Sequence, residues 1–305
     1  MQAPFHKAIQ TVCQVLVGKD HQVRLAVCAL LAKGHLLIED IPGVGKTTLS
    51  QALSTVLGLQ HQRVQFTSDL LPSDIVGTTI FNRESNAFEL HKGAVFTEVL
   101  LADEVNRATP KTQSALLEAM AERQVTIDGV THNLAESFFV IATQNPERHG
   151  GTFPLPESQL DRFMMRLTLG YPDPAAEKAI LLGKAGVNKI ATLQSVLTPA
   201  ELLSAHQQVL AVRLSDAVLG YIQRLIAKSR KHDDISVGLS PRAALSLVHA
   251  AQAWAWMDER EYLIPEDVQA VFSVVTSHRL RDANYAVPSN DGLARHLLEQ
   301  VGVLE

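Results

Sequence analysis

The segment DIPGVGKTT, residues 40–48, constrains this chain more than any other feature of its sequence. It follows the short apolar run HLLIE (35–39) and precedes a helical pattern at 46–57, which predicts a strand, a loop and a helix in that order. In a glycine-rich loop at this place, the backbone N–H groups can surround an anion with help from the positive end of the helix. The segment therefore predicts a phosphate-binding site on an α/β sheet.

Individual residues of this loop have expected roles. Lys46 is expected to reach the β- and γ-phosphates of a nucleotide, and the Thr47 hydroxyl is expected to bind Mg²⁺. Asp40 replaces the first glycine of the pattern G-x-x-x-x-G-K-[ST], which is a mild departure because aspartate tolerates turns. An ordinary strand–helix turn is the alternative interpretation. The expected nucleotide contacts are Pro42, Gly43, Val44, Gly45, Lys46, Thr47 and Thr48.

Short apolar runs alternate with helical patterns up to Gly170, which predicts a parallel sheet flanked by helices. The runs after the first lie at 63–66, 99–102, 138–143 and 163–169. Two further segments, at about 77–94 and 125–134, have the features of hairpins and interrupt this order. After Gly170 the strand patterns stop and helical patterns follow. We therefore expect an α/β domain over 1–185 and an all-helical domain over 186–305.

Polar residues follow two more of the apolar runs, at the end of a sheet where ligands bind. The run EVLLADE (98–104) ends in Asp103, which can hold Mg²⁺, and Glu104, which can accept a proton from an attacking water. The run at 138–143 leads to Asn145, whose amide could hold that water or the γ-phosphate. A solvated acidic strand end and an Asn145-Pro146 turn are the alternatives. A base beside Mg²⁺ favours hydrolysis over transfer to a small substrate.

Charge and composition exclude several classes of protein. The 305 residues include 27 Lys and Arg and 32 Asp and Glu, and neither half of the chain is basic, which disfavours charge-driven binding of nucleic acid. No run reaches the roughly 18 apolar residues of a membrane helix, and the N-terminal residues lack the pattern of a secretion signal. Cys13 and Cys28 are too few for a disulfide framework. A soluble cytoplasmic protein is therefore expected.

Taken together, several segments of this chain resemble the MoxR family of AAA+ ATPases. They are IPGVGKTT, LLADEVNRA, LLEAMAERQVTIDG, FVIATQNP, PLPESQLDRFMMRL and GLSPRAALSL, and the likeness runs from about residue 5 to 303. The resemblance implies an αβα sandwich with a parallel five-stranded sheet of order 5-1-4-3-2 and a C-terminal helical lid. It also implies a helix-2 insertion, which matches 77–94, and a hairpin before the Asn145 strand, which matches 125–134.

The resemblance also implies roles for arginines. Arg162 matches the arginine finger that one subunit supplies to the nucleotide of its neighbour, and an intrachain ion pair with Asp161 or Glu157 is the alternative. Arg166 would replace Arg162 as the finger if the register were different, although its position suggests a sheet face. Arg242 matches the sensor-2 arginine, which reaches from the lid to the bound nucleotide; a plain helix-start charge is the alternative.

The function that the resemblance implies is Mg²⁺-dependent ATP hydrolysis in a ring, typically a hexamer, with ATP at each subunit boundary. The work would be chaperone-like remodelling, maturation or metal-cofactor insertion of a protein client, together with a partner containing a von Willebrand factor A domain. A nucleic-acid or chelatase-type motor is the alternative, disfavoured because the hairpin VTIDGVTHNL has no Lys or Arg. A non-catalytic scaffold is disfavoured by the intact Lys46, Thr47, Asp103 and Glu104. The client itself is not identified by any residue.

Overall fold

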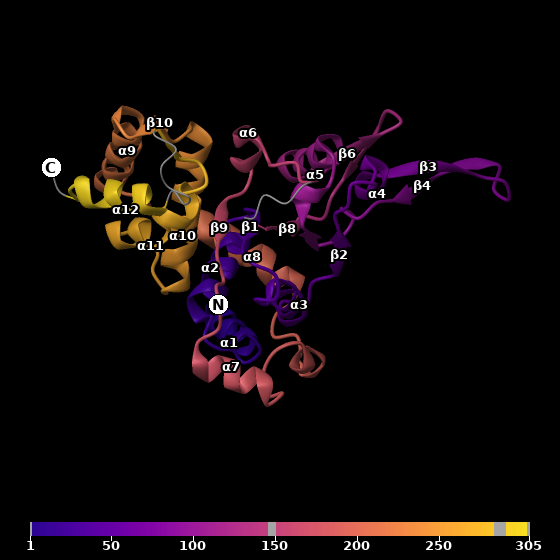
Figure 1. The fold of residues 1–305 in the computed structure, drawn as a ribbon, viewed down its shortest axis with the longest axis horizontal. Helices are drawn as coiled ribbons and strands as arrows, with labels where there is room; N and C mark the ends of the chain where they lie inside the picture. The colour runs from indigo at the N-terminus through magenta and orange to yellow at the C-terminus, as the bar shows by residue number, and fades with distance from the viewer. Residues whose placement is uncertain (1, 146–150, 284–290, 304–305) are drawn as a thin grey trace.

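A parallel sheet of five strands organises the computed structural model, which describes residues 2–145, 151–283 and 291–303, so that Pro146 lies outside the described residues (Figure 1). The strands are β1 (Leu36–Glu39), β2 (His61–Gln65), β5 (Val99–Asp103), β8 (Phe139–Gln144) and β9 (Met165–Leu167). Their spatial order is β2-β5-β8-β1-β9. When these five strands are numbered 1 to 5 along the chain and the sheet is followed from β9 to β2, the order is 5-1-4-3-2, which confirms the expected topology.

Alternating side chains of the central strands enter two hydrophobic cores, one on each face of the sheet. Leu36 and Ile38 of β1 belong to the core that contains α1 (Gln2–Cys13), α2 (Asp20–Leu31) and α3 (Lys46–Val56). Leu37 faces the other core, which contains α4 (Pro72–Val76) and α5 (Pro110–Glu122). Because both faces of the sheet are covered, the central strands have continuous apolar sequences. The expected αβα sandwich is confirmed.

Both expected hairpins are present. One consists of β3 (Gly77–Asn82) and β4 (Ala87–Lys92), which project from the body as an arm (Figure 1). The other consists of β6 (Gln124–Ile127) and β7 (Val130–Asn133). Its turn residues Asp128 and Gly129 have φ values of 49° and 81°, the left-handed conformation that a tight two-residue hairpin turn requires.

The chain beyond Gly170 is helical, as expected. Its helices are α7 (Pro174–Leu181), α8 (Pro199–Leu210), α9 (Asp216–Lys231), α10 (Pro241–Met257), α11 (Pro265–Thr276) and α12 (Asp291–Gln300). The short helix η2 (Val187–Thr192) also lies there, and the short helices η1 (Val105–Arg107) and α6 (Glu157–Leu160) lie in the α/β part of the chain. The expectation that strands stop after Gly170 is wrong in one detail, because β10 (Ile235–Val237) pairs with β11 (Arg281–Asp282). These short strands have no sequence pattern of their own and form only where the packed helices bring them together.

The lid helices α9–α12 gather at one side of the sheet, whereas α8 lies against the body (Figure 1). α8 contacts α2 of the α/β body as well as α10. The Nε2 atom of His206 on α8 hydrogen-bonds to the carbonyl of Leu30 at 3.1 Å. Of the helices that the structure describes, none is long and apolar enough to cross a membrane.

Three buried histidines make the fold sensitive to acid. Burial lowers the pKa of His35 to about 3, that of His206 to about 4, and that of His278 well below its usual value. The Nδ1 atom of His35 accepts a hydrogen bond from the backbone N–H of Val140 at 3.0 Å, so a proton there would meet another donor. The folded chain therefore keeps these rings neutral at pH values where the unfolded chain protonates them.

We expect the free energy of unfolding to fall as the pH drops below about 6.5, by about 1.4 kcal/mol per pH unit for each such histidine. Urea unfolding between pH 7 and pH 5 measures this slope. His35→Phe is expected to lower the slope of the unfolding free energy against pH by the contribution of about one proton, because one of the three rings is removed. The exposed His91, changed to Gln, serves as the control and is expected to leave the slope unchanged. An identical slope in the His35 variant would show that His35 does not titrate between the two states.

Candidate active site

The segment 40–45 turns sharply between β1 and α3 and forms the floor of a cavity of about 320 Å³. Gly43 and Gly45 have φ values of 86° and 102°. A Cβ atom at either position would meet nothing within 4 Å, so it is the backbone conformation that requires glycine there. The predicted strand, loop and helix are confirmed. Thr47, together with Lys46 and Thr48 on the first turn of α3, lines the cavity.

Asp40 does more than the sequence interpretation proposed. Its buried carboxylate accepts hydrogen bonds from the backbone N–H groups of Leu169 and Gly170, both at 2.6 Å. It also accepts one from the N–H of Ile41 at 2.8 Å. Asp40, which replaces the first glycine of the pattern, therefore joins the start of the loop to the residues just after β9. The pattern alone could not indicate this role.

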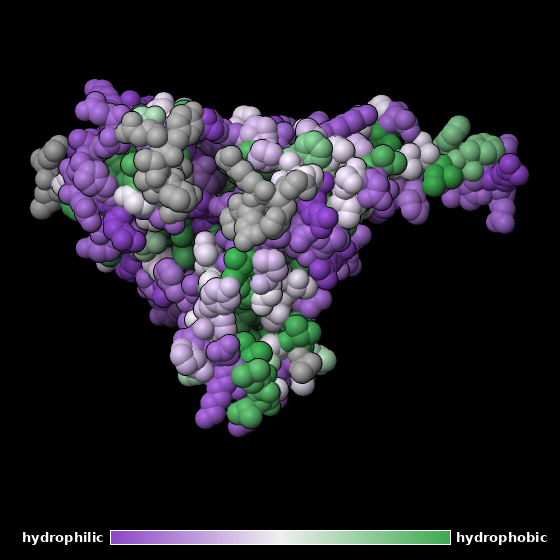
Figure 2. All heavy atoms as spheres, viewed as in Figure 1, coloured by the Kyte–Doolittle hydropathy of each residue, from purple (hydrophilic) through white to green (hydrophobic). Residues whose placement is uncertain are grey.

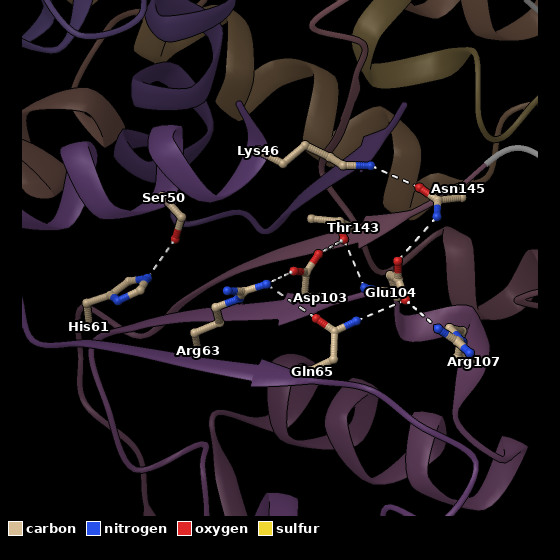
Figure 3. A network of polar contacts seen from close by, with 10 residues as sticks. All are labelled: Lys46, Ser50, His61, Arg63, Gln65, Asp103, Glu104, Arg107, Thr143 and Asn145. Carbon is tan, nitrogen blue, oxygen red and sulfur yellow. Dashed lines mark hydrogen bonds and ion pairs between the residues drawn. The ribbon is translucent and has the colours of Figure 1, made fainter. Parts of the chain in front are cut away.

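Lys46, Asn145 and Glu104 form a chain of polar contacts across the cavity (Figure 3). The Lys46 ammonium donates to the carbonyl of Asp40 at 2.6 Å and to Oδ1 of Asn145 at 3.2 Å. The Asn145 amide donates in turn to Oε1 of Glu104 at 3.4 Å. Burial lowers the pKa of Lys46, and the nearby carboxylates of Asp40, Asp103 and Glu104 oppose that shift. The three residues predicted from separate strands and from the loop do lie together.

Asp103 ends β5, and each oxygen of its carboxylate accepts one hydrogen bond. The Thr143 hydroxyl donates to Oδ1 at 2.5 Å, and the Arg63 guanidinium donates to Oδ2 at 2.7 Å. Arg63 comes from β2 and lines the same cavity, but sequence reasoning missed it. The signal was the alternation in β2, where Arg63 and Gln65 share a face.

Glu104 lies in the left-handed region, with a φ of 55°, which costs a residue other than glycine about 1–2 kcal/mol. Its carboxylate accepts hydrogen bonds from Gln65 at 2.9 Å and Arg107 at 3.1 Å, in addition to Asn145 (Figure 3). Such strain persists where the surroundings hold it, typically at functional sites. Gln65 was the second residue that sequence reasoning missed.

The donor set at the cavity suits a hard divalent cation. The Thr47 hydroxyl and the Asp103 carboxylate both line it, and oxygen ligands of this kind, few in number, are what Mg²⁺ uses beside substrate phosphates. Arg63 and such a cation would both be attracted to the Asp103 carboxylate, so the two would compete for it.

A second, more apolar pocket of about 190 Å³ adjoins the first, sharing Gly43, Gly45, Thr48 and Val187 with it. The turn between α1 and α2 supplies one wall, and the segment that contains α7 supplies the other. Further lining residues are Val15, Leu16, Val17, Lys19, Val44, Pro172, Ile180 and Gly186. An apolar pocket beside a phosphate cradle can hold the flat ring of a base. Of these residues, the sequence had indicated Val44.

The predicted arginines lie outside the cavity of their own chain. Arg162 is half-buried and donates to the carbonyl of Leu117 on α5 at 2.7 Å. The alternative of an ion pair between Arg162 and Asp161 or Glu157 is wrong, because Asp161 pairs with Arg279 and Glu157 pairs with Arg281.

Arg166 and Arg242 lie in different surroundings. Arg166 bridges Glu39 of β1 at 2.9 Å and Asp291 of α12 at 2.8 Å, the sheet-face position that was expected. Arg242 is exposed on the first turn of α10 and is not among the residues that line its own chain's cavity. The expected contact of Arg242 with a nucleotide therefore stays a prediction. The Ser240 hydroxyl, at the start of the same helix, donates to the Asp161 carboxylate at 3.0 Å.

Comparison with known proteins agrees with this geometry. Residues 35–165 match the ATPase family associated with various cellular activities (AAA), and residues 227–300 match the AAA lid domain. The chain is 42% identical to Bacillus subtilis YeaC over 97% of this chain and 94% of that one. It is 40% identical to Mycobacterium tuberculosis Chaperone MoxR1, over 90% of this chain and 74% of that one.

Two solved structures share the fold. A crystal structure from Cytophaga hutchinsonii superposes with a TM-score of 0.91 at 34% identity, covering all of this chain and 96% of that one. A full-length MCM homolog from Methanopyrus kandleri gives a TM-score of 0.61 at 16% identity, covering 99% of this chain and 62% of that one. The second likeness concerns the fold alone.

Proposed function

Because the chain belongs to the MoxR family of AAA+ ATPases, we propose that it binds ATP with Mg²⁺ in the cavity around Lys46 and hydrolyses the γ-phosphate. One observation carries the proposal: the loop lysine, the paired carboxylates and the strand-end amide converge on a single cavity. The adjoining apolar pocket would hold the adenine. The residues proposed for the nucleotide are Pro42, Gly43, Val44, Gly45, Lys46, Thr47 and Thr48.

In this proposal Lys46 exchanges the Asp40 carbonyl for the β- and γ-phosphate oxygens, and the loop N–H groups surround the phosphates. Thr47 and Asp103 would hold Mg²⁺, and Arg63 would compete with it for the Asp103 carboxylate. When bound, the metal would neutralise the negative charge that develops on the phosphates. Glu104, released by Gln65 and Arg107, then takes the proton of the attacking water.

Asn145 would orient that water or the γ-phosphate through its amide. Its contacts with both Lys46 and Glu104 support this role, because they place the amide between the phosphate-binding cation and the general base. The amide then has to be held within hydrogen-bonding range of both groups as the nucleotide enters.

We propose that Arg162 and Arg242 act in trans, on the nucleotide of the next subunit. Two observations support this assignment: neither arginine lines the cavity of its own chain, and a hydrogen bond joins Ser240, two residues before Arg242, to Asp161, next to Arg162. Head-to-tail contacts between different surfaces close into rings, and a hexamer is the proposed assembly. Arg166 is engaged by two carboxylates, which favours Arg162 as the finger. The proposed domains are 1–185 and 186–305.

The proposed work is remodelling, maturation or metal-cofactor insertion of a protein client in the cytoplasm, together with a von Willebrand factor A domain partner. The name of the relative Chaperone MoxR1 supports a chaperone-like task. The arm carries exposed Ile80, Phe81 and Phe88, which supply an apolar surface for protein contact (Figure 2). The hairpin β6–β7 has no Lys or Arg, which disfavours the alternative of a nucleic-acid motor.

Lys46→Ala tests the nucleotide site. We expect it to weaken ATP binding at least about tenfold, the factor that a charge-assisted hydrogen bond represents, and to abolish phosphate release. Binding of a fluorescent ATP analogue and Mg²⁺-dependent phosphate release measure this, with the exposed Lys111→Ala as the control. Stimulation of wild-type turnover by unfolded polypeptide, and not by single-stranded DNA, would favour the protein-client proposal; the reverse would favour the alternative.

A further inference from the structure

Residues of the lid form several hydrogen bonds and ion pairs with residues 157–164. This segment carries Arg162, and we name it the finger segment. The carboxylate of Asp161 accepts hydrogen bonds from Nε of Arg279 at 2.7 Å and from the Ser240 hydroxyl at 3.0 Å. Ser240 caps α10, and Arg279 follows the end of α11. One carboxylate of the finger segment is therefore bound by both of these lid helices.

Arg279 contacts the finger segment at more than its carboxylate. Its guanidinium donates to the carbonyls of Phe163 at 2.7 Å, Met164 at 3.0 Å and Asp161 at 3.2 Å. The side chain is 3% exposed, so these bonds are made away from water. A planar guanidinium fixes the relative positions of the acceptors around it, because its donors leave in fixed directions. Arg279 thus defines the backbone path on both sides of Arg162.

The lid residues on either side of Arg279 make further contacts with the finger segment. The buried ring of His278 hydrogen-bonds to the carbonyl of Phe163 at 2.9 Å, and Arg281 pairs with Glu157. These contacts go to the residues around Arg162. Its own guanidinium bonds instead to Leu117, and its buried Nε has no hydrogen-bond partner among the described residues. The backbone under Arg162 is fixed, whereas the side chain keeps an unused donor.

We propose that Arg279 is a positioning residue for Arg162, holding the finger segment so that this arginine can be presented to the neighbouring subunit. The inference rests on the proposed trans role of Arg162. It follows that the lid and the finger segment move as one body. A role of Arg279 in folding alone would instead impair every property of the subunit, including its own nucleotide site.

The test uses Arg279→Met, which keeps a long unbranched side chain and removes the guanidinium with its donors. We expect the kcat of the homogeneous assembly to fall by about 10², the cost of a misplaced catalytic group, with the affinity for ATP unchanged. Arg162→Ala, measured in parallel, is the reference for the complete loss of the finger. If Arg162→Ala keeps its activity, the proposed trans function fails; if it loses activity and Arg279→Met does not, the positioning role fails.

Mixed assemblies separate positioning from folding. Subunits with Arg279→Met keep an intact nucleotide site, so mixing them with Lys46→Ala subunits, whose fingers are intact, is expected to restore part of the activity. Mixing them with Arg162→Ala subunits is expected to restore none, because neither variant presents a working finger. Absence of recovery with Lys46→Ala would overturn the positioning role in favour of a general structural one.

Arg260→Met is the matched control. Arg260 also pairs with a buried lid carboxylate, Asp267, but at the other end of α10 and α11. It is expected to lower stability without changing kcat. If Arg279→Met does not fold, Asp161→Asn replaces it, because it removes the shared charge with almost no change in volume. It is expected to show the same pattern of recovery, and a different pattern overturns the proposal.

Discussion

A mixture of Arg162→Ala and Lys46→Ala subunits is expected to hydrolyse ATP, although each variant alone is nearly inactive. Removal of an arginine finger lowers turnover by about 10³–10⁵, and Lys46→Ala removes the phosphate contact. In a mixed ring, an intact Lys46 cavity from one variant can meet an intact Arg162 from the other. With random incorporation of equal amounts, about a quarter of the interfaces are complete. Phosphate release across a series of mixing ratios measures this recovery.

Sedimentation has to show that the mixed assemblies form. If they form and remain inactive, Arg162 does not act on the neighbouring subunit. Turnover per wild-type subunit is expected to rise with protein concentration for the same reason, since binding favours the assembled state by mass action. A rate per subunit that is independent of concentration down to the monomer would contradict the trans assignment.

Replacing Glu104 by glutamine is expected to lower turnover by about 10²–10⁴, the usual contribution of a general base, with ATP still bound. Glutamine keeps the shape of the side chain and cannot accept the proton of the attacking water. Single-turnover phosphate release and binding of a fluorescent ATP analogue separate the two effects. Glu118→Gln, at an exposed position on α5, is the control. Turnover close to that of the wild type would exclude Glu104 as the base.

The parts of the site that follow apolar strands could be predicted from the sequence. β5 and β8 are buried on both faces, so their ends, and the polar residues Asp103, Glu104 and Asn145 there, stand out against an apolar run. β2 has the sequence HQRVQ and lies at the edge of the sheet, half-exposed. Because its residues are mostly polar, the alternation that puts Arg63 and Gln65 on one face was the only sign of them, and it did not show that they contact the two carboxylates.

Contacts between distant segments were also beyond a reading of the sequence. The pairing of Arg279 with Asp161 joins residues 118 positions apart, and no local pattern encodes it. The same applies to Arg242, whose helix start could be recognised from Ser240-Pro241 while its distance from the cavity could not. Residue propensities and hydrophobic periodicity predict where a helix or strand lies in the sequence. The position of a lid helix relative to the cavity depends instead on how the helices pack against the rest of the protein.

Asp40 connects the glycine-rich loop to the chain just after β9. Its carboxylate ties the loop around the nucleotide to Leu169 and Gly170, just after β9, and the finger segment ends just before β9. If Arg162 acts on the neighbour as proposed, the three-residue strand β9 lies between the loop that contacts the nucleotide of one subunit and the arginine that completes the site of the next. We then expect a change of the loop on loss of the γ-phosphate to be transmitted to the next site.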